Sequence, residues 1–161
     1  MLAAQTVRLD SYVLRLAKPE DPRPGDLIVG QTSYQDVYGH YLIIDEIGSS
    51  YTGGPVLSLS EWELGVDGIH DLRLSFNSNG VLDVITVTAA GIYFEAIVSI
   101  LEEAYPVDFD AGSEKGFRSL NFTADGYVLM IDDEPMNERM TISLVSEDFL
   151  NAKMAAQKRY A

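Results

Sequence analysis

Two histidines, His40 and His70, are the side chains of this sequence best suited to act as general bases near neutral pH. His40 stands among tyrosines, and His70 precedes Asp71. A serine hydrolase needs a nucleophile elbow beside such a base, and no serine in the sequence has that context. The two histidines are also too far apart in sequence for the short ligand spacing that zinc sites prefer. We therefore expect no hydrolytic centre and no zinc site.

Acidic side chains suggest two other kinds of chemistry. The spacing Asp108-x-Asp110-x-Gly112 begins like a calcium loop, but serines replace the turn glycine and the bidentate glutamate of that loop. A looser calcium site of Asp108, Asp110 and Glu114 stays open, although a solvated loop is the commoner meaning of such a pattern. The glycine pair at 53–54 lacks the lysine of a phosphate loop. Because the sequence departs from both the calcium-loop and the phosphate-loop patterns, we predict neither a metal nor a cofactor.

A run of three acids, Asp132, Asp133 and Glu134, could supply the two carboxylates of a glycoside hydrolase. Adjacent acids before a proline more often form an exposed connector, and this is how we interpret the run. We therefore predict that the protein is not an enzyme. Its function is then expected to depend on its surface.

The surface chemistry is strongly acidic, because 25 Asp and Glu oppose 11 Lys and Arg, for a formal charge of −14. Phosphate backbones and anionic membranes are repelled by such a charge, so nucleic acids and membranes are not expected partners. High solubility is one explanation of the charge, and a basic protein partner is the other. Zero cysteines fit the cytoplasm and the periplasm equally well.

The stretch 72–105 predicts the centre of the fold. Apolar and polar residues alternate from Leu72 to Phe76, and Asn77-Ser78-Asn79-Gly80 then supplies a tight turn into a second strand. After Gly91, apolar residues recur with a helical period, which predicts an amphipathic helix over 92–105. This pattern predicts a long helix packed on one face of an antiparallel sheet.

The other segments complete a single α+β domain over residues 1–161, a length that suits one domain. Capping residues predict shorter helices at 33–41 and 147–159. A glycine-rich loop is expected at 49–55. Period-2 patterns predict further strands, for a sheet of about six or seven. These strands are expected at 6–16, 42–47, 56–64, 120–122, 127–131 and 140–144.

Aromatic residues are concentrated between positions 34 and 62, where protein-binding patches and core packing are both plausible explanations. Under the binding interpretation, acids surround the aromatics and meet a basic partner, and the run 132–134 forms a second contact edge. The predicted partner-binding residues are Tyr38, Tyr51, Trp62, Glu61, Glu63, Asp132, Asp133 and Glu134.

The segment Gly30-Gln31-Thr32-Ser33-Tyr34-Gln35-Asp36-Val37-Tyr38-Gly39-His40-Tyr41 resembles the opening of small bacterial secreted or periplasmic α+β domains. The pattern continues through 68–76, Gly80-Val81-Leu82, Ile85, 94–101 and Tyr105. It is similar to domains related to the β-lactamase inhibitory protein and to immunity proteins of toxin systems, including type VI secretion. The resemblance implies a non-catalytic binder that covers a partner's surface.

The acidic charge, the aromatic residues and the resemblance favour an inhibitor, most specifically an immunity protein that neutralises a bacterial toxin by covering its active site. A small-ligand or lipid-binding module is the first alternative, with a pocket lined by Phe94, Ile97, Phe122 and Met130. An acidic mimic of nucleic acid that blocks a nuclease is the second.

Overall fold

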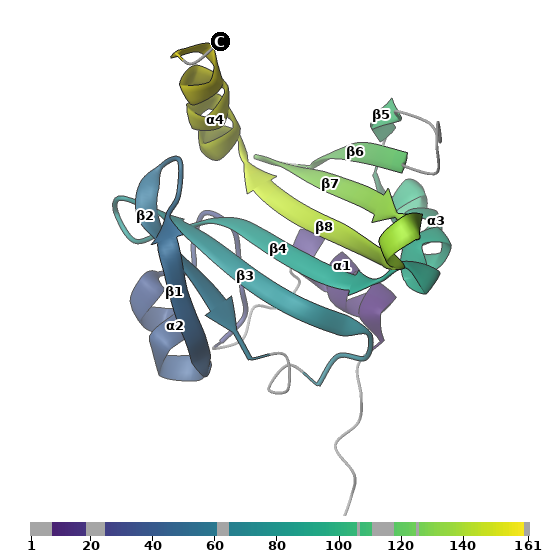
Figure 1. Cartoon of the computed structure of the whole chain (residues 1–161), viewed down its shortest axis with the longest axis horizontal. Coiled ribbons are helices and arrows are strands. Elements are labelled where there is room, and N and C mark those ends of the chain that lie inside the picture. Colours follow the sequence, from purple (N-terminus) through teal and green to yellow (C-terminus); the bar gives the residue numbers. More distant parts are fainter. Residues whose placement is uncertain are drawn as a thin grey trace, which may run out of the picture.

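The computed structural model describes residues 8–18, 25–60, 65–105, 107–110, 118–124 and 126–159. Eight antiparallel strands form one sheet in the order β1-β2-β3-β4-β8-β7-β6-β5 (Figure 1). The strands are β1 (Ile43–Ser49), β2 (Gly53–Leu59), β3 (Ile69–Asn77), β4 (Leu82–Ala90), β5 (Val107–Asp110), β6 (Arg118–Ala124), β7 (Tyr127–Glu134) and β8 (Arg139–Ser146). The helices are α1 (Leu9–Ala17), α2 (Tyr34–His40), α3 (Phe94–Ala104) and α4 (Glu147–Arg159), with short turns η2 (Gly91–Tyr93) and η4 (Pro135–Asn137).

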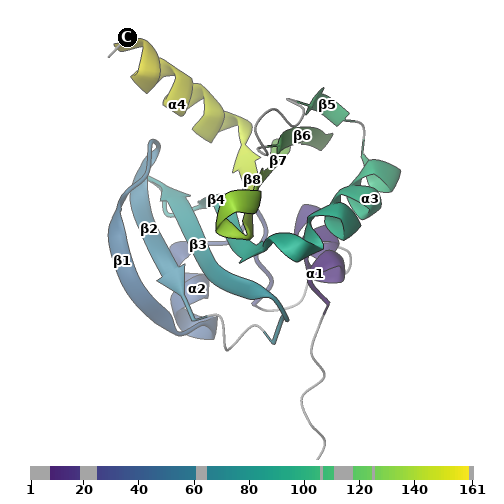
Figure 2. The same ribbon diagram turned by 45° about the vertical axis from the view of Figure 1, so that its right-hand side comes forward.

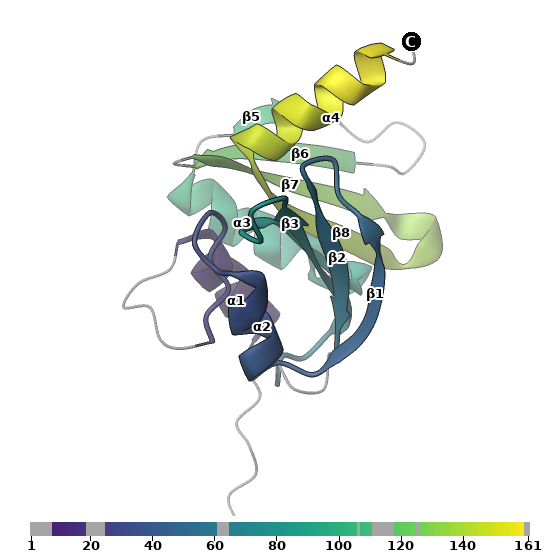
Figure 3. The same ribbon diagram turned by 90° about the vertical axis from the view of Figure 1, so that its left-hand side faces the viewer.

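The sheet consists of two four-stranded meanders, β1–β4 and β5–β8, that pair along β4 and β8. The strands turn steadily across it, so that β1 and β2 stand nearly upright in Figure 3 while β6 and β7 run nearly flat. Helices α1, α2 and α3 lie on one side of the sheet (Figures 2 and 3). This arrangement confirms the predicted α+β class.

The predicted hairpin and helix form the centre of the domain. The Asn77 side chain accepts hydrogen bonds from the backbone amides of Asn79 and Val81, and Gly80 adopts a φ of 76° that L side chains rarely reach. After η2, helix α3 begins and buries its apolar stripe against the sheet, namely Phe94, Ile97, Val98 and Leu101. The prediction from the periodicity is confirmed here.

Segment 9–17 is a helix, whereas a strand over 6–16 was expected. Its buried residues Leu9, Val13, Leu16 and Ala17 recur at positions i, i+4, i+7 and i+8, which is a helical period. A strand over 6–16 would need a bulge near Ser11 to bring its two halves into phase, because Val7 and Leu9 are out of phase with Tyr12, Leu14 and Leu16, and the helix needs none. Helix α1 packs against α3 and so extends the helical layer.

The core lies between this helical layer and the sheet. Side chains alternate along each strand, so one set faces the helices and the other faces away. The set that faces the helices is fully buried and contains Leu72, Leu74, Ile85, Val87, Leu120, Phe122, Leu129, Ile131, Ile142 and Leu144. None of the helices in the described ranges has the length and apolar content needed to cross a membrane.

Helix α4 leaves the end of β8 and projects beyond the sheet in all three views (Figures 1–3). None of its residues is buried. Its start is held by Ser146, whose Oγ accepts a hydrogen bond from the Phe149 amide at 3.1 Å, as the capping pattern predicted. The same Oγ donates to Oδ1 of the buried Asp83 at 3.0 Å, which ties the helix to β4.

Candidate protein-binding surface

Strand β1 forms one edge of the sheet, and six of its seven residues are exposed. Its register against β2 shifts between Ile43 and Asp45 and again between Glu46 and Gly48. Ile44 and Ile47 are therefore the extra residues of two β-bulges. Bulges and charges commonly protect edge strands from unwanted pairing, but exposed isoleucines do not serve that purpose.

Exposed apolar side chains concentrate along this edge. In the described part of the chain, nine large hydrophobic side chains are exposed, and five of them lie between positions 38 and 51. Their exposed fractions range from 44% to 65%. We call these five the β1 edge surface: Tyr38, Leu42, Ile44, Ile47 and Tyr51. A concentration of this kind is typical of contact surfaces.

Helix α2 positions one end of the β1 edge surface. Ser33 caps the helix, because its Oγ accepts from the Asp36 amide at 3.1 Å while the Asp36 carboxylate accepts from the Ser33 amide at 3.2 Å. These bonds hold the pKa of Asp36 below its usual value. The rings of Tyr34 and Tyr38 lie 4.5 Å apart, measured between centroids. Tyr38 is therefore presented beside β1 by a helix with a fixed start.

The hydroxyl of Tyr34 joins α2 to β1 by donating to Oε2 of Glu46 at 3.4 Å. Hydrogen bonding with Tyr38, then burial and the Glu46 carboxylate, raise the pKa of Tyr34 to about 12. Tyr34 therefore stays protonated at physiological pH and acts as a hydrogen-bond donor. The carboxylates of Asp45 and Glu46 remain exposed on β1, which gives the apolar edge an acidic component.

The turn between β1 and β2 positions the other end of the β1 edge surface. Ser50 Oγ donates to the Phe76 carbonyl at 2.6 Å, and Thr52 Oγ1 donates to the buried carboxylate of Asp83. Between them, the Tyr51 ring contacts the Phe149 ring of α4 edge-on, with centroids 5.6 Å apart. β2 begins at Gly53, so the expected glycine-rich loop 49–55 is in fact a tight turn.

The structure places the eight predicted binding residues in three groups. Tyr38 and Tyr51 lie on the β1 edge surface, as exposed residues. Trp62, Glu61 and Glu63 fall outside the described residues. The sequence did not identify Leu42, Ile44 and Ile47, because an apolar run in a strand usually predicts burial, and the position of a strand within its sheet cannot be read from its own residues.

The third group, Asp132, Asp133 and Glu134, is not the exposed connector that was expected. All three belong to β7 and are half-buried, because β7 continues to Glu134 and pairs with β8 along its length. Asp132 accepts a hydrogen bond from Ser119, and Glu134 accepts from Arg139 at 2.9 Å. Internal partners therefore already occupy two of these acids.

The environments of Asp133 and Glu134 shift their pKa values in opposite directions. Burial, and then the charge of Glu95, raise the pKa of Asp133, against a smaller opposing effect of Arg118. Hydrogen bonds from Arg139 and then Asn137 lower the pKa of Glu134.

Asp133 also borders a hollow of about 460 Å³ between η2 and η4. The most exposed apolar side chains of the described residues, Ile92 (85%) and Met136 (91%), lie on these two turns.

The pocket expected for a small ligand is not formed by its four predicted residues. Phe94, Ile97 and Phe122 are buried in the core beneath α3. Met130 lies between the buried Leu129 and Ile131 on β7, so strand alternation directs it to the opposite face of the sheet. The prediction of a pocket lined by all four residues is therefore wrong.

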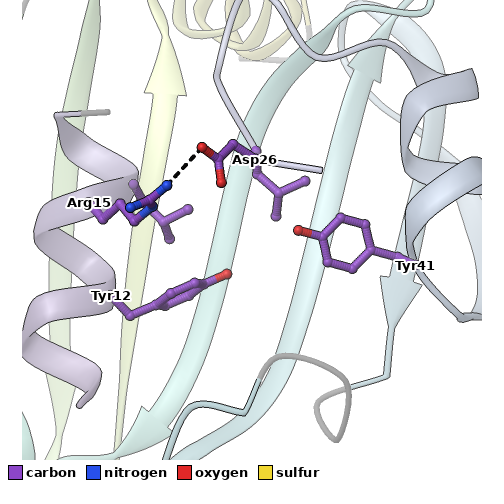
Figure 4. A pocket seen from close by; sticks show the side chains of 6 residues that line it. Tyr12, Arg15, Asp26 and Tyr41 are labelled. Atoms are coloured by element: carbon purple, nitrogen blue, oxygen red, sulfur yellow. Dashed lines mark hydrogen bonds and ion pairs between the residues drawn. The ribbon is translucent and has the colours of Figure 1, made fainter. Parts of the chain in front are cut away.

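Helix α1 contributes a small polar cavity that the sequence did not predict. Tyr12 and Arg15 of α1 converge with Asp26 and Tyr41 around about 40 Å³, room for about one water molecule (Figure 4). Arg15 Nη2 lies 2.9 Å from Asp26 Oδ2, and the Tyr41 hydroxyl donates to the Gly25 carbonyl. Burial, followed by Tyr41 and Asp26, raises the pKa of Tyr12, so its phenol is a donor rather than a base. The cluster joins α1 to the segment before α2.

The candidate catalytic and metal residues remain dispersed where the structure describes them. His40 Nδ1 donates to the Asp36 carbonyl at 2.8 Å on the exposed end of α2, and His70 lies at the start of β3. Asp108 and Asp110 belong to β5, while Glu114 lies outside the described residues, so the looser calcium site is untested. Within the described ranges, no group of three or more possible ligands could hold a metal ion.

Comparisons with protein-family models, with curated proteins and with solved structures gave no match for this chain. The geometry of the β1 edge surface is therefore the basis for a functional proposal.

Proposed function

We propose that this chain is a non-catalytic protein-binding domain and that the β1 edge surface is its contact site. The observation that carries the proposal is the concentration of five exposed hydrophobic side chains along one edge strand and its two ends. Exposing this much apolar area costs solvation free energy, which a partner recovers when it covers the surface.

The partner is proposed to be a basic protein. Asp45 and Glu46 lie among the apolar residues of β1, and the whole chain has a formal charge of −14. Charge of one sign accelerates encounter with a partner of the opposite sign and disfavours acidic competitors. Two copies of the chain pairing antiparallel through β1 would place these acids against each other, which disfavours a symmetric dimer.

In its most specific form, the proposal is an immunity protein whose β1 edge surface covers the active site of a bacterial toxin. The lack of an assembled catalytic group among the described residues is compatible with this role. Co-expression provides the test of this form: the parent chain protects cells from the toxin, whereas the double variant Ile44→Ser/Ile47→Ser does not.

The contact itself is tested by photo-crosslinking in the native host. A photoreactive residue at position 47 should capture one basic protein, and the same residue at position 136 should not, although Met136 is the more exposed side chain. Equal capture at both positions, or no capture at position 47, would contradict the proposal. A partner that crosslinks at position 47 but has no toxic activity would exclude the immunity role and leave the binding function intact.

A further inference from the structure

The face of the sheet that points away from the helices contains a polar hollow of about 560 Å³ across β3, β4 and β8. Strand alternation sends Arg73 of β3, Thr86 and Thr88 of β4, and Thr141 of β8 to this face, since their neighbours along each strand are buried. His70, Asp71 and Arg139 complete the rim. A hollow of this volume is within the range that holds small molecules.

Two arginines of the hollow are oriented by acids that engage only part of each guanidinium. Arg73 Nε donates to Asp71 Oδ2 at 2.8 Å, and Arg139 Nε donates to Glu134 Oε2 at 2.9 Å. The terminal Nη groups of both arginines make no hydrogen bond within the part of the chain that the structure describes. Each guanidinium is thus held in place while its Nη donors remain available.

The floor of the hollow adds hydroxyl groups. The hydroxyls of Thr86, Thr88 and Thr141 have no hydrogen-bond partner among the described residues, and Thr88 pairs directly with Thr141 across β4 and β8. The carboxylate of Asp71 is already engaged by Arg73 and, at 3.5 Å, by Ser58. Beside the arginine Nη groups, the hollow therefore offers three hydroxyls that can donate, while Arg73 neutralises the Asp71 carboxylate, and these donors suit a ligand rich in acceptor oxygens.

We infer that this hollow binds a small molecule bearing oxyanion groups, either carboxylates or phosphates, through Arg73, Arg139 and the three threonine hydroxyls. The site is separate from the β1 edge surface and does not depend on the proposed protein-binding function. The charge of −14 repels polyanions at long range, so small anions rather than nucleic acids are the expected ligands.

The test is a titration of the intact chain with inorganic phosphate and with citrate, at constant ionic strength, followed by amide and arginine Nε signals in NMR spectra. Saturable shifts at Arg73, Thr88 and Thr141 support the proposal, and the anion that binds more tightly identifies phosphate or carboxylate chemistry. Arg73→Gln and Arg139→Gln should each weaken binding by about tenfold, because each removes a charge-assisted donor pair.

Two further variants control for an effect of the substitutions on folding and for non-specific anion binding. Thr88→Val keeps the shape and strand preference of the side chain but removes its hydroxyl, and should weaken binding about fivefold. Arg8→Gln removes an exposed arginine that is paired with Asp10 on α1, and should leave the affinity unchanged. Shifts that do not saturate, or that respond to Arg8→Gln as much as to Arg73→Gln, would overturn the inference.

Discussion

Strands β1 and β8 both contain three or more large apolar residues, yet they lie in opposite environments. On central strand β8, Met140, Ile142 and Leu144 are fully buried between the sheet and the helical layer. On edge strand β1, Ile44 and Ile47 are exposed at two bulges. Residue type alone therefore does not decide the role of an apolar side chain. On β8 it stabilises the fold, and on β1 we propose that it binds a partner.

The largest expected difference between the two strands is in folding stability. Ile142→Ala should lower the free energy of unfolding by about 2–5 kcal/mol, because it leaves a cavity in the core. Ile44→Ala should change it by no more than about 0.5 kcal/mol, because the side chain is exposed. Urea denaturation of both variants checks this. Similar losses would show that β1 is part of the core.

A smaller effect is expected at the residues that cap the helices next to each strand. Ser146→Ala removes the cap of α4 and a donor to the buried Asp83, and should cost about 1–3 kcal/mol. Ser33→Ala removes the cap of α2 alone, and should cost about 1 kcal/mol. Thermal unfolding compares the two variants. An equal or larger loss of stability for Ser33→Ala would contradict a stabilising role for the hydrogen bond between Ser146 and Asp83.

The smallest expected effects on folding stability concern two acids where β7 pairs with β8, Asp133 and Glu134. Their substitutions should change the stability in opposite directions. The pKa of Asp133 is raised in the folded state, so folding disfavours its charged carboxylate. The protonated carboxyl contributes stability below the unfolded pKa, and this contribution is lost as the pH rises through the folded pKa. Asp133→Asn should therefore stabilise the protein at neutral pH, and this gain should fade in acid.

Glu134 provides the matched opposite case. Its folded pKa is lowered, so it stabilises the fold above its unfolded pKa and loses that effect as the pH falls through the folded value. Glu134→Gln should destabilise the protein at neutral pH, and the difference from the parent should vanish in acid. Urea denaturation at neutral and acidic pH measures both variants, and effects of the same sign would refute the two assigned environments.

The sequence predicted the elements whose periodicity is long and regular. The β3–β4 hairpin, helix α3, and the capped helices α2 and α4 follow directly from alternation, a 3.6-residue stripe and serine caps. Helix α1 was mistaken for a strand, because its nine residues are short and their apolar positions fit a bulged strand nearly as well. β5 was missed because four residues are too few for an alternating pattern to stand out.

The candidate site was less predictable than the fold. The aromatic concentration drew attention to Tyr38 and Tyr51, which are exposed, but it left core packing as an open explanation. The isoleucines of β1 are exposed only because β1 is the edge strand. Strand order depends on pairings between distant segments, which no local pattern encodes. The exposed connector expected at 132–134 was wrong for the same reason, since the partners Ser119 and Arg139 come from neighbouring strands.

The most direct test of the account is the affinity of the crosslinked partner for two matched double variants. Ile44→Ser/Ile47→Ser removes two exposed apolar side chains from β1, and Ile92→Ser/Met136→Ser removes two that are still more exposed, at η2 and η4. The account predicts that Kd rises by about tenfold or more for the β1 variant and by less than about twofold for the other. An equal effect, or the reverse order, would contradict the assignment of the β1 edge surface as the contact site.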